Sequence, residues 1–342
     1  MLKKIKNIIL SNKKLRKIII RTIRTQQINT FKISNFPIYD YFEKDNGDKI
    51  SLHRNLRSFV TPDWQKKFQK HVINGKEVNT SFDLDLNLAK TEYQLYFNYF
   101  EKIALSLNFK IEETKILEIG TGNMLLSHLM AERYLNTEFT CSDIDSYYSN
   151  LSKDDDIVFA RKKVEKNFER KVPYITDNIS KSSFDDNSFD VIFSNTVLEH
   201  INDLDNAFKE MKRILKPGGF CFHIYNPFFS FNGAHTICSL DHPWGHCVLT
   251  ENEYFKLVDT YYPEFAEISK SFYINDLNKK SIAEFKTSIN NASFSNTIFL
   301  PETNLNLMQL LLPDTLKRTT SLYPTSNMED ILTSSVIVVL QK

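Results

Sequence analysis

The sequence is poor in the features that define several protein classes. It has four cysteines in 342 residues, and no two of them show C-x-x-C spacing, which excludes a disulfide framework or a zinc ribbon. Cys141 and Cys221 fall in predicted buried strands, where a reduced cysteine packs as a small hydrophobic residue. No apolar run approaches the ~20 residues needed to span a bilayer. We therefore expect a reduced, cytoplasmic protein without membrane spans.

Acidic residues are absent from the first 39 positions, which hold ten Lys or Arg. The net charge of +1 therefore conceals an acidic remainder with 33 basic and 42 acidic residues. An acidic body repels phosphate backbones, which excludes a protein that wraps nucleic acid.

Residues 1–30 combine isoleucines near helical spacing with Lys and Arg, and no A-x-A cleavage site follows them. This pattern predicts a basic amphipathic helix and not a signal peptide. Residues 1–24 could contact an anionic membrane surface from the cytoplasmic side. The alternative is that the helix packs on this protein or on the partner in a homodimer.

The remaining chain divides into two parts. Residues 31–110 are predicted to form an N-terminal helical extension or cap, with a helix at 86–107. Residues 111–342 are predicted to form one α/β domain with substrate-lid insertions at 226–254 and 275–330, because no Pro- or Gly-rich linker divides them.

Strand and helix patterns alternate through this domain. Strands are expected at 115–120, 138–145, 172–178, 189–195, 220–226, 265–274 and 334–342, and helices at 125–134 and 207–215. Such alternation indicates a Rossmann-like fold: a seven-stranded, mostly parallel sheet with an antiparallel last strand and helices on both faces.

The stretch ILEIGTGNM at 116–124 predicts a strand, a tight turn and a helix whose free N–H groups surround a ligand. A dinucleotide fold would need a third glycine where Leu125 stands, and a P-loop would need Gly-Lys-Ser/Thr. Asp143 ends the next strand, 23 residues after Gly120, where a carboxylate can accept hydrogen bonds from ribose hydroxyls. Asp145 is the competing candidate, with an N-cap or turn role as its alternative.

Four motifs in order then resemble one family. ILEIGTGN, CSDID, YITDNISKSSFDDNSFDVIFSNTVLEHI and MKRILKPGGF are similar to motifs of class I S-adenosylmethionine-dependent methyltransferases of type 11, over residues 112–225. The departure from the family pattern is Asn123-Met124, where many members have a third glycine.

The resemblance implies S-adenosylmethionine as cofactor and assigns its contacts. The implied residues are Glu118, Gly120 and Gly122 for the methionine and ribose, Asp143 for the ribose hydroxyls, Asp177 and Asn178 for the adenine, and Ser194 and Asn195 beneath the methionine. His200 matches a frequent family position, either as a cofactor contact or as a support for the loop.

The acceptor is expected to meet residues 223–254, which leave the fifth strand at its carboxyl end. This segment holds four of the eight histidines, and His235, His242 or His246 could serve as the general base. Tyr225, Asp241 and Trp244 are the predicted substrate-binding residues. The alternatives for His242 and His246 are a loop-capping role or, with Asp241, a metal site. Since Pro-Trp-Gly interrupts the His-x-x-x-His spacing, we predict no metal.

Aromatic rings beside histidines suit a sugar, which predicts O-methylation of a sugar or glycan intermediate. A looser resemblance to methyltransferases associated with polysaccharide genes points to surface polysaccharide biosynthesis. Alternatives are a lipid, quinone or other small-metabolite acceptor, and a catalytically silent partner or regulatory subunit with this fold. A nicotinamide oxidoreductase is the most distant alternative.

Overall fold

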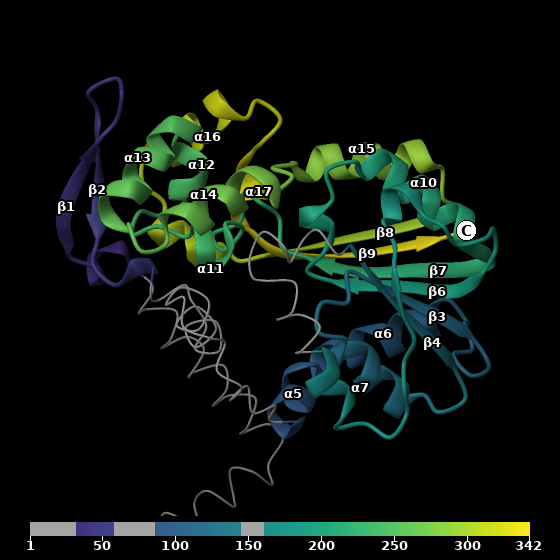
Figure 1. Ribbon diagram of the computed structural model, residues 1–342. Coiled ribbons are helices and arrows are strands. Elements are labelled where there is room, and N and C mark those ends of the chain that lie inside the picture. The colour runs from purple at the N-terminus through teal and green to yellow at the C-terminus, as the bar shows by residue number, and fades with distance from the viewer. Residues whose placement is uncertain (1–31, 58–85, 145–160) are drawn as a thin grey trace, which may run out of the picture.

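The structure is a computed structural model that describes residues 32–57, 86–144 and 161–342 (Figure 1). The amphipathic helix predicted at 1–30 lies outside the described residues, as does 58–85 of the predicted extension. Among the described residues, no helix combines the length and apolarity needed to cross a membrane.

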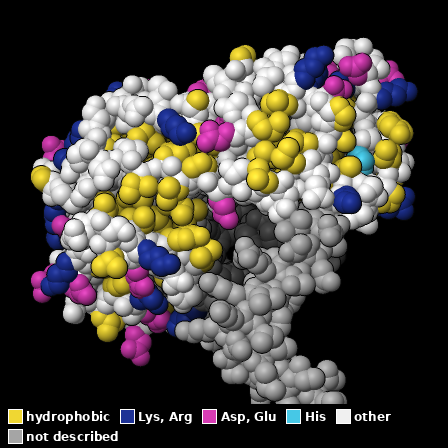
Figure 2. All heavy atoms as spheres, turned by 180° about the vertical axis from the view of Figure 1, so that it is seen from behind, with side chains coloured by type: hydrophobic (Ala, Val, Ile, Leu, Met, Phe, Trp, Pro, Cys, Tyr) yellow, Lys and Arg dark blue, Asp and Glu magenta, His cyan; other side chains and the backbone are white. Residues whose placement is uncertain are grey.

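On the face of the molecule opposite to that seen in Figure 1, hydrophobic side chains gather in patches that charged side chains border (Figure 2).

A seven-stranded sheet forms one part of the molecule, which we call the sheet lobe. The strand order is β5-β4-β3-β6-β7-β9-β8. Its strands are β3 (Lys115–Ile119), β4 (Glu138–Asp143), β5 (Tyr174–Thr176), β6 (Phe189–Asn195), β7 (Leu215–Tyr225), β8 (Asn296–Thr303) and β9 (Thr333–Gln341). All neighbours from β5 to β7 pair in parallel, and β9 is antiparallel to both β7 and β8. The predicted fold class is confirmed.

Helices cover both faces of this sheet (Figure 1). The covering elements are α5 (Leu86–Glu92), α6 (Gln94–Ser106) and α7 (Leu125–Arg133) on one face, and α10 (Leu204–Ile214) and α15 (Ile282–Ala292) on the other; η2 (Ile179–Lys181) and η3 (Leu198–His200) are short turns at strand ends. Alternation along the strands divides the core: Ile116 belongs to the α6–α7 side and Leu117 to the α10–α15 side. Both faces are apolar because both are buried.

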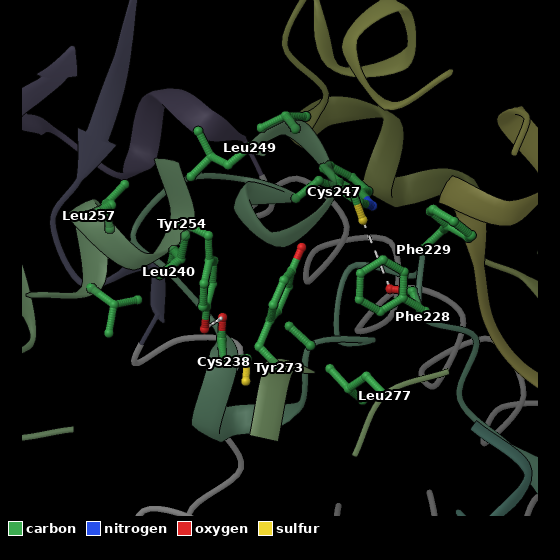
Figure 3. Close-up of a cluster of buried hydrophobic side chains, with 14 of the residues drawn as sticks. Phe228, Phe229, Cys238, Leu240, Cys247, Leu249, Tyr254, Leu257, Tyr273 and Leu277 are labelled. Carbon is green, nitrogen blue, oxygen red and sulfur yellow. Dashed lines mark hydrogen bonds between the residues drawn. The ribbon is translucent and has the colours of Figure 1, made fainter. Parts of the chain in front are cut away.

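The second part, the helical lobe, surrounds a core of aromatic and aliphatic residues (Figure 3). Its elements are η1 (Ile33–Asn35), β1 (Ile38–Glu43), β2 (Lys49–His53), α11 (His235–Cys238), α12 (Gly245–Val248), α13 (Glu251–Tyr261), α14 (Ala266–Asn275), η4 (Leu305–Leu310), α16 (Thr315–Leu322) and α17 (Met328–Leu332). Tyr254 and Tyr273 stack with ring centroids 4.2 Å apart. Tyr254 donates a hydrogen bond to the Cys238 carbonyl, which satisfies its buried hydroxyl.

Three predictions differ from the structure. The strand expected at 265–274 is wrong, because this segment is the helix α14, whose buried residues Ala266, Ser269, Phe272 and Tyr273 follow helical spacing. The segment 275–330, expected as a lid, supplies α15 and the edge strand β8 to the sheet lobe. The described part of the helical extension contains the hairpin β1–β2, after the short turn η1, while its predicted helix at 86–107 is present as α5 and α6.

Because α15 packs on the sheet, its buried face should support folding. Ile289 is 1% exposed within the α10–α15 side of the core. We expect Ile289→Ala to lower the free energy of unfolding by about 2–5 kcal/mol through lost burial and a residual cavity. Thr287→Ala, on the exposed face of the same helix, should stay within about 0.5 kcal/mol of wild type. Denaturant unfolding followed by circular dichroism measures both; equal stability of the two variants would contradict this role.

Candidate active site

The chain turns tightly after β3. Gly120 and Gly122 have φ angles of +65° and +54°, in the left-handed region that glycine enters without strain. Met124 has a φ of +67°, so a residue with a side chain takes the third left-handed position. That conformation costs a non-glycine residue about 1–2 kcal/mol, and burial of the Met124 side chain against the sheet offsets it. The turn therefore forms without the third glycine.

Asp143 joins the end of β4 to this turn. Its Oδ2 accepts a hydrogen bond from the Gly122 N–H at 2.8 Å, and its Oδ1 accepts one from the Ile144 N–H. Arg161 donates from Nε to the Gly122 carbonyl at 2.8 Å, and its Nη2 lies 3.8 Å from Asp143. The guanidinium also covers the Tyr174 ring at 3.8 Å. The ends of β3, β4 and β5 are thus held together by one acid and one arginine.

Glu118 is buried in β3, beneath the same turn. Its Oε2 accepts hydrogen bonds from the hydroxyls of Thr121, at 2.6 Å, and Ser127, at 2.5 Å. Burial raises the pKa of Glu118 to about 7, and the nearby charge of Asp143 acts in the same direction. This carboxyl therefore organises the turn from inside the protein.

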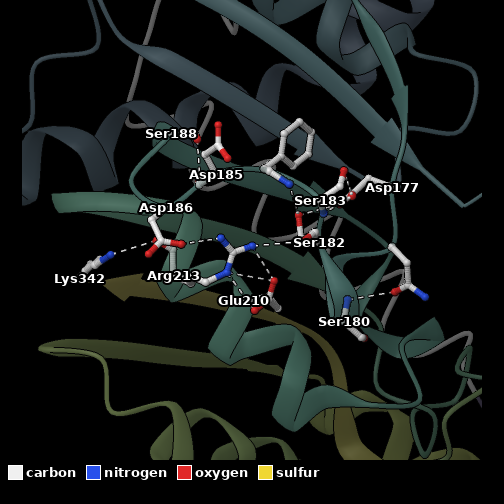
Figure 4. Close-up of polar contacts among 12 residues, drawn as sticks. Asp177, Ser180, Ser182, Ser183, Asp185, Asp186, Ser188, Glu210, Arg213 and Lys342 are labelled. Atoms are coloured by element: carbon white, nitrogen blue, oxygen red, sulfur yellow. Dashed lines mark hydrogen bonds and ion pairs between the residues drawn. The ribbon is translucent and has the colours of Figure 1, made fainter.

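Asp177 and Asn178 follow β5 (Figure 4). Asp177 accepts hydrogen bonds from the Ser183 N–H and from the hydroxyls of Ser182 and Ser183, between 2.7 and 2.9 Å. Asn178 caps η2 by accepting from the Ser180 N–H at 3.0 Å. A carboxylate has about four acceptor positions, so the loop itself uses most of those on Asp177. Both residues lie at the predicted edge of the sheet, and both hold the local backbone.

Ser194 and Asn195 end β6. The Ser194 hydroxyl lies 2.7 Å from His223 Nδ1, and both side chains are fully buried. Burial lowers the pKa of His223 to about 3, which keeps this pair neutral. Tyr96 on α6 donates to the Ser194 carbonyl at 3.4 Å. The pair therefore fixes neighbouring strands, while Asn195 remains partly exposed beyond it.

A second polar group lies after β6 and β7. Glu199 and His200 come from η3 and His235 begins α11, and one ligand atom from each lies within 4.8 Å of the other two. Burial raises the pKa of Glu199 to about 8 and lowers the pKa of His200 to about 4 and that of His235 to about 3. Tyr225, at the end of β7, stacks on Phe285 with ring centroids 4.4 Å apart. Burial raises the pKa of Tyr225, and the Glu199 charge acts in the same direction. Of the predicted acceptor residues, His235 belongs to this group.

His242 and His246 instead bind backbone inside the helical lobe. His242 Nδ1 donates to the Ser51 carbonyl and His246 Nε2 donates to the Phe228 carbonyl, both at 2.8 Å. Burial lowers the pKa of each to about 4. The predicted role as a general base does not fit them, because each ring is enclosed and held by packing. The loop-capping alternative fits these contacts.

Asp241 and Trp244 also hold the helical lobe together. Asp241 accepts from the Arg57 N–H at 2.8 Å and from the Tyr39 hydroxyl at 3.3 Å, which fastens the β1–β2 region. Trp244 is 1% exposed and meets the Phe231 ring edge-on at 4.9 Å. The predicted substrate contacts of Asp241 and Trp244 have no support in this geometry, since Asp241 is bonded to the β1–β2 region and Trp244 is buried.

Comparison with known proteins finds a family match for the segment that contains the carboxyl ends of β3, β4, β5 and β6. Residues 117–223 match the family model described as a methyltransferase domain. They run from β3 into β7 and include Gly120, Gly122 and Asp143. Residues 117–223 are a methyltransferase domain. The predicted resemblance is confirmed at this level; association with polysaccharide genes stays a prediction.

Curated relatives match this methyltransferase domain and its surroundings. A malonyl-[acyl-carrier protein] O-methyltransferase from Priestia megaterium is 32% identical over 154 residues, covering 43% of this chain and 50% of the relative. A ubiquinone/menaquinone biosynthesis C-methyltransferase from Shewanella sediminis is 32% identical over 109 residues, covering 31% of this chain and 39% of the relative. The chain thus spans half or less of the length of these relatives.

Solved structures with distant sequences also align with the chain. An S-adenosylmethionine-dependent methyltransferase from Mesorhizobium loti has a TM-score of 0.43 at 10% identity, covering 70% of this chain and 96% of that one. Phosphoethanolamine N-methyltransferase 2 from Haemonchus contortus, in complex with S-adenosyl-L-methionine, has a TM-score of 0.44 at 16% identity. The alignment covers 86% of this chain and 62% of that one.

Sequence reasoning missed two residues around the methyltransferase domain's site. Glu199 stands directly before His200 in VLEHI, and an acid beside a histidine at a strand end was the available signal. Arg161 had no such signal, because its contacts with the Gly122 carbonyl and the Tyr174 ring arise only when β3 and β5 come together.

Glu118 should make the stability of the methyltransferase domain depend on pH. Its folded-state pKa of about 7 exceeds the ordinary value of 4.5, so the folded protein keeps a proton that the unfolded chain releases. The free energy of unfolding should therefore fall as pH rises between these values, by roughly 3 kcal/mol from this group.

Glu118→Gln removes this titration, so the free energy of unfolding of wild type minus that of the variant should fall by the same amount as pH rises across this range. Denaturant unfolding of both proteins at several pH values measures it. Glu112→Gln, at an exposed acid before the same strand, should follow the wild type. A constant difference between wild type and Glu118→Gln would contradict the raised pKa.

Proposed function

We propose that the chain is an S-adenosylmethionine-dependent methyltransferase that modifies an oxygen atom of a small acceptor. The observation that carries this proposal is the methyltransferase domain at 117–223, whose Gly120–Gly122 turn is hydrogen-bonded to Asp143. The acceptor groups fit the cofactor: Glu118, Asp143 and Asp177 are buried carboxylates at adjacent strand ends, and a carboxylate accepts hydrogen bonds from hydroxyl and amino groups. When bound, S-adenosylmethionine supplies a methyl group already activated by its sulfonium.

The protein must then position the acceptor and exclude water. Ser194 and Asn195 lie at the end of β6, and the group of Glu199, His200 and His235 follows on the same edge of the sheet. An acceptor hydroxyl directed at that group would meet buried polar atoms that can bind its oxygen. The Priestia megaterium relative is named as an O-methyltransferase, in keeping with an oxygen acceptor.

The sugar or glycan acceptor predicted from the sequence stays a prediction. It depended on exposed aromatic rings, whereas Phe228, Phe229 and Trp244 are buried in the helical lobe. A lipid, quinone or small-metabolite acceptor is the second candidate, favoured by the quinone-biosynthesis relative from Shewanella sediminis. Assays with a monosaccharide hydroxyl, a malonyl thioester and a quinol separate these classes.

Cofactor binding is the first test. Asp143→Ala should weaken S-adenosylmethionine binding about 10- to 100-fold, the loss expected for hydrogen bonds to a charged group. Asp143→Asn separates charge from geometry, because its amide oxygen can still accept from the Gly122 N–H. The control is Asp185→Ala, at an exposed acid on the loop before β6. In isothermal titration calorimetry, wild-type affinity in both Asp143 variants would exclude this cofactor site.

Turnover tests the acceptor side. His235→Gln should lower kcat about 100-fold or more if the residue helps to activate the acceptor, with S-adenosylmethionine affinity unchanged. His242→Gln can still donate to the Ser51 carbonyl and should retain the wild-type kcat. Radiolabelled methyl transfer with the best acceptor measures both. The reverse pattern would return the catalytic role to His242.

A further inference from the structure

Glu199, which is buried, and His200 and His235, which are partly buried, form a cluster with the composition of a metal site. Glu199 is 1% exposed, and its Oε1 lies 3.8 Å from His235 Nε2. The two imidazole rings lie 4.9 Å apart between centroids and are tilted by 30°. The three possible ligand atoms are all within 4.8 Å of one another. The 3.8 Å between Glu199 Oε1 and His235 Nε2 is within the span of about 4 Å that one shared ion allows at ligand distances of about 2 Å.

The protein does not satisfy the polar atoms of this cluster by itself. Among the described residues, Glu199 Oε2 and His235 Nε2 are buried and have no hydrogen-bond partner. The separation of Glu199 from His235 exceeds a hydrogen bond, and the described residues place no Lys or Arg in an ion pair with Glu199. Its Oε1 accepts a long hydrogen bond from the Asn226 N–H at 3.2 Å. Buried polar groups in folded proteins are rarely left unpaired, so these atoms point to a ligand.

The surroundings orient the cluster as metal sites require. His200 Nδ1 donates to the Asp276 carbonyl, which assigns the proton to Nδ1 and directs Nε2 as the ligating nitrogen. A backbone carbonyl that fixes the tautomer of a ligating histidine is the usual outer partner in such sites. Phe272 packs edge-on against both imidazole rings, which restricts their rotation.

We propose that Glu199, His200 and His235 bind one divalent transition-metal ion, with zinc as the cation that the set fits best. Two imidazoles and one carboxylate without a thiolate are a ligand set for zinc, and also for manganese or ferrous iron. Three protein ligands leave a coordination position open. This proposal differs from the sequence prediction of no metal. His242, His246 and Asp241 are not ligands in it, because they bind other protein groups.

The open coordination position of the metal ion could hold the acceptor, a role that rests on the proposed function. β6 leads into η3 and β7 leads towards α11, so the cluster lies where an acceptor is expected. A cation there would bind the acceptor oxygen, lower the pKa of its hydroxyl and orient it.

Zinc binding tests the site without S-adenosylmethionine or acceptor. The full chain, treated with chelator and dialysed, is titrated with zinc chloride by calorimetry, and we expect one ion per chain. Glu199→Gln and His235→Gln should each weaken zinc binding about 100-fold or more, since loss of an outer partner alone costs about 10- to 100-fold. His128→Gln is the matched control, a buried histidine of α7 stacked on Phe168, and should bind zinc as wild type does.

Circular dichroism establishes that each variant is folded. If Glu199→Gln or His235→Gln is not folded, His235→Ala replaces it. Absence of saturable zinc binding by wild type, or wild-type zinc affinity in both cluster variants, would overturn the site. Zinc binding without S-adenosylmethionine binding would leave the site standing and refute the proposed function. The converse result would refute only the metal site.

Discussion

Parallel pairing from β5 to β7 is the constraint on which the rest of the structure depends. It brings the carboxyl ends of five neighbouring strands to one edge of the sheet, so residues far apart in the chain lie side by side, as Ile116 and Val191 do. Glu118, Asp143 and Asp177 reach that edge because each lies in or just after a strand. The hydrogen bond from the Gly122 N–H to Asp143 then joins two of those ends directly.

Four buried acids lie at or near the carboxyl edge of the sheet, and their hydrogen-bond partners differ. Glu118 is held by two hydroxyls, Asp143 by backbone N–H groups beside Arg161, and Asp177 by two serines. Glu199 has one long backbone contact and an oxygen without a partner among the described residues. Since desolvating a carboxyl is costly unless it is paired, this difference separates acids that build the turn from one suited to a ligand.

The helical lobe explains why the histidine-rich segment misled sequence reasoning. His242, His246, Asp241 and Trp244 lie close in sequence to His235, yet they make contacts with the β1–β2 hairpin and the Phe228 region. Composition cannot distinguish a histidine that stabilises a loop from one that faces a site, because both roles use the same ring nitrogens. The sequence of α14 likewise predicts a strand, because its aromatic and β-branched residues are typical of both helices and strands when buried.

The sequence by itself determined the order of strands and helices from 115 to 225 and the positions of Gly120, Gly122 and Asp143, because hydrophobic periodicity and local turn chemistry act over a few residues. Only the tertiary structure decided where 275–330 belongs, how Arg161 reaches the turn, and that Glu199 and His200 meet His235. The Arg161–Gly122 and His200–His235 contacts join residues 39 and 35 positions apart, and the geometry of all these contacts exists only when separate elements pack together.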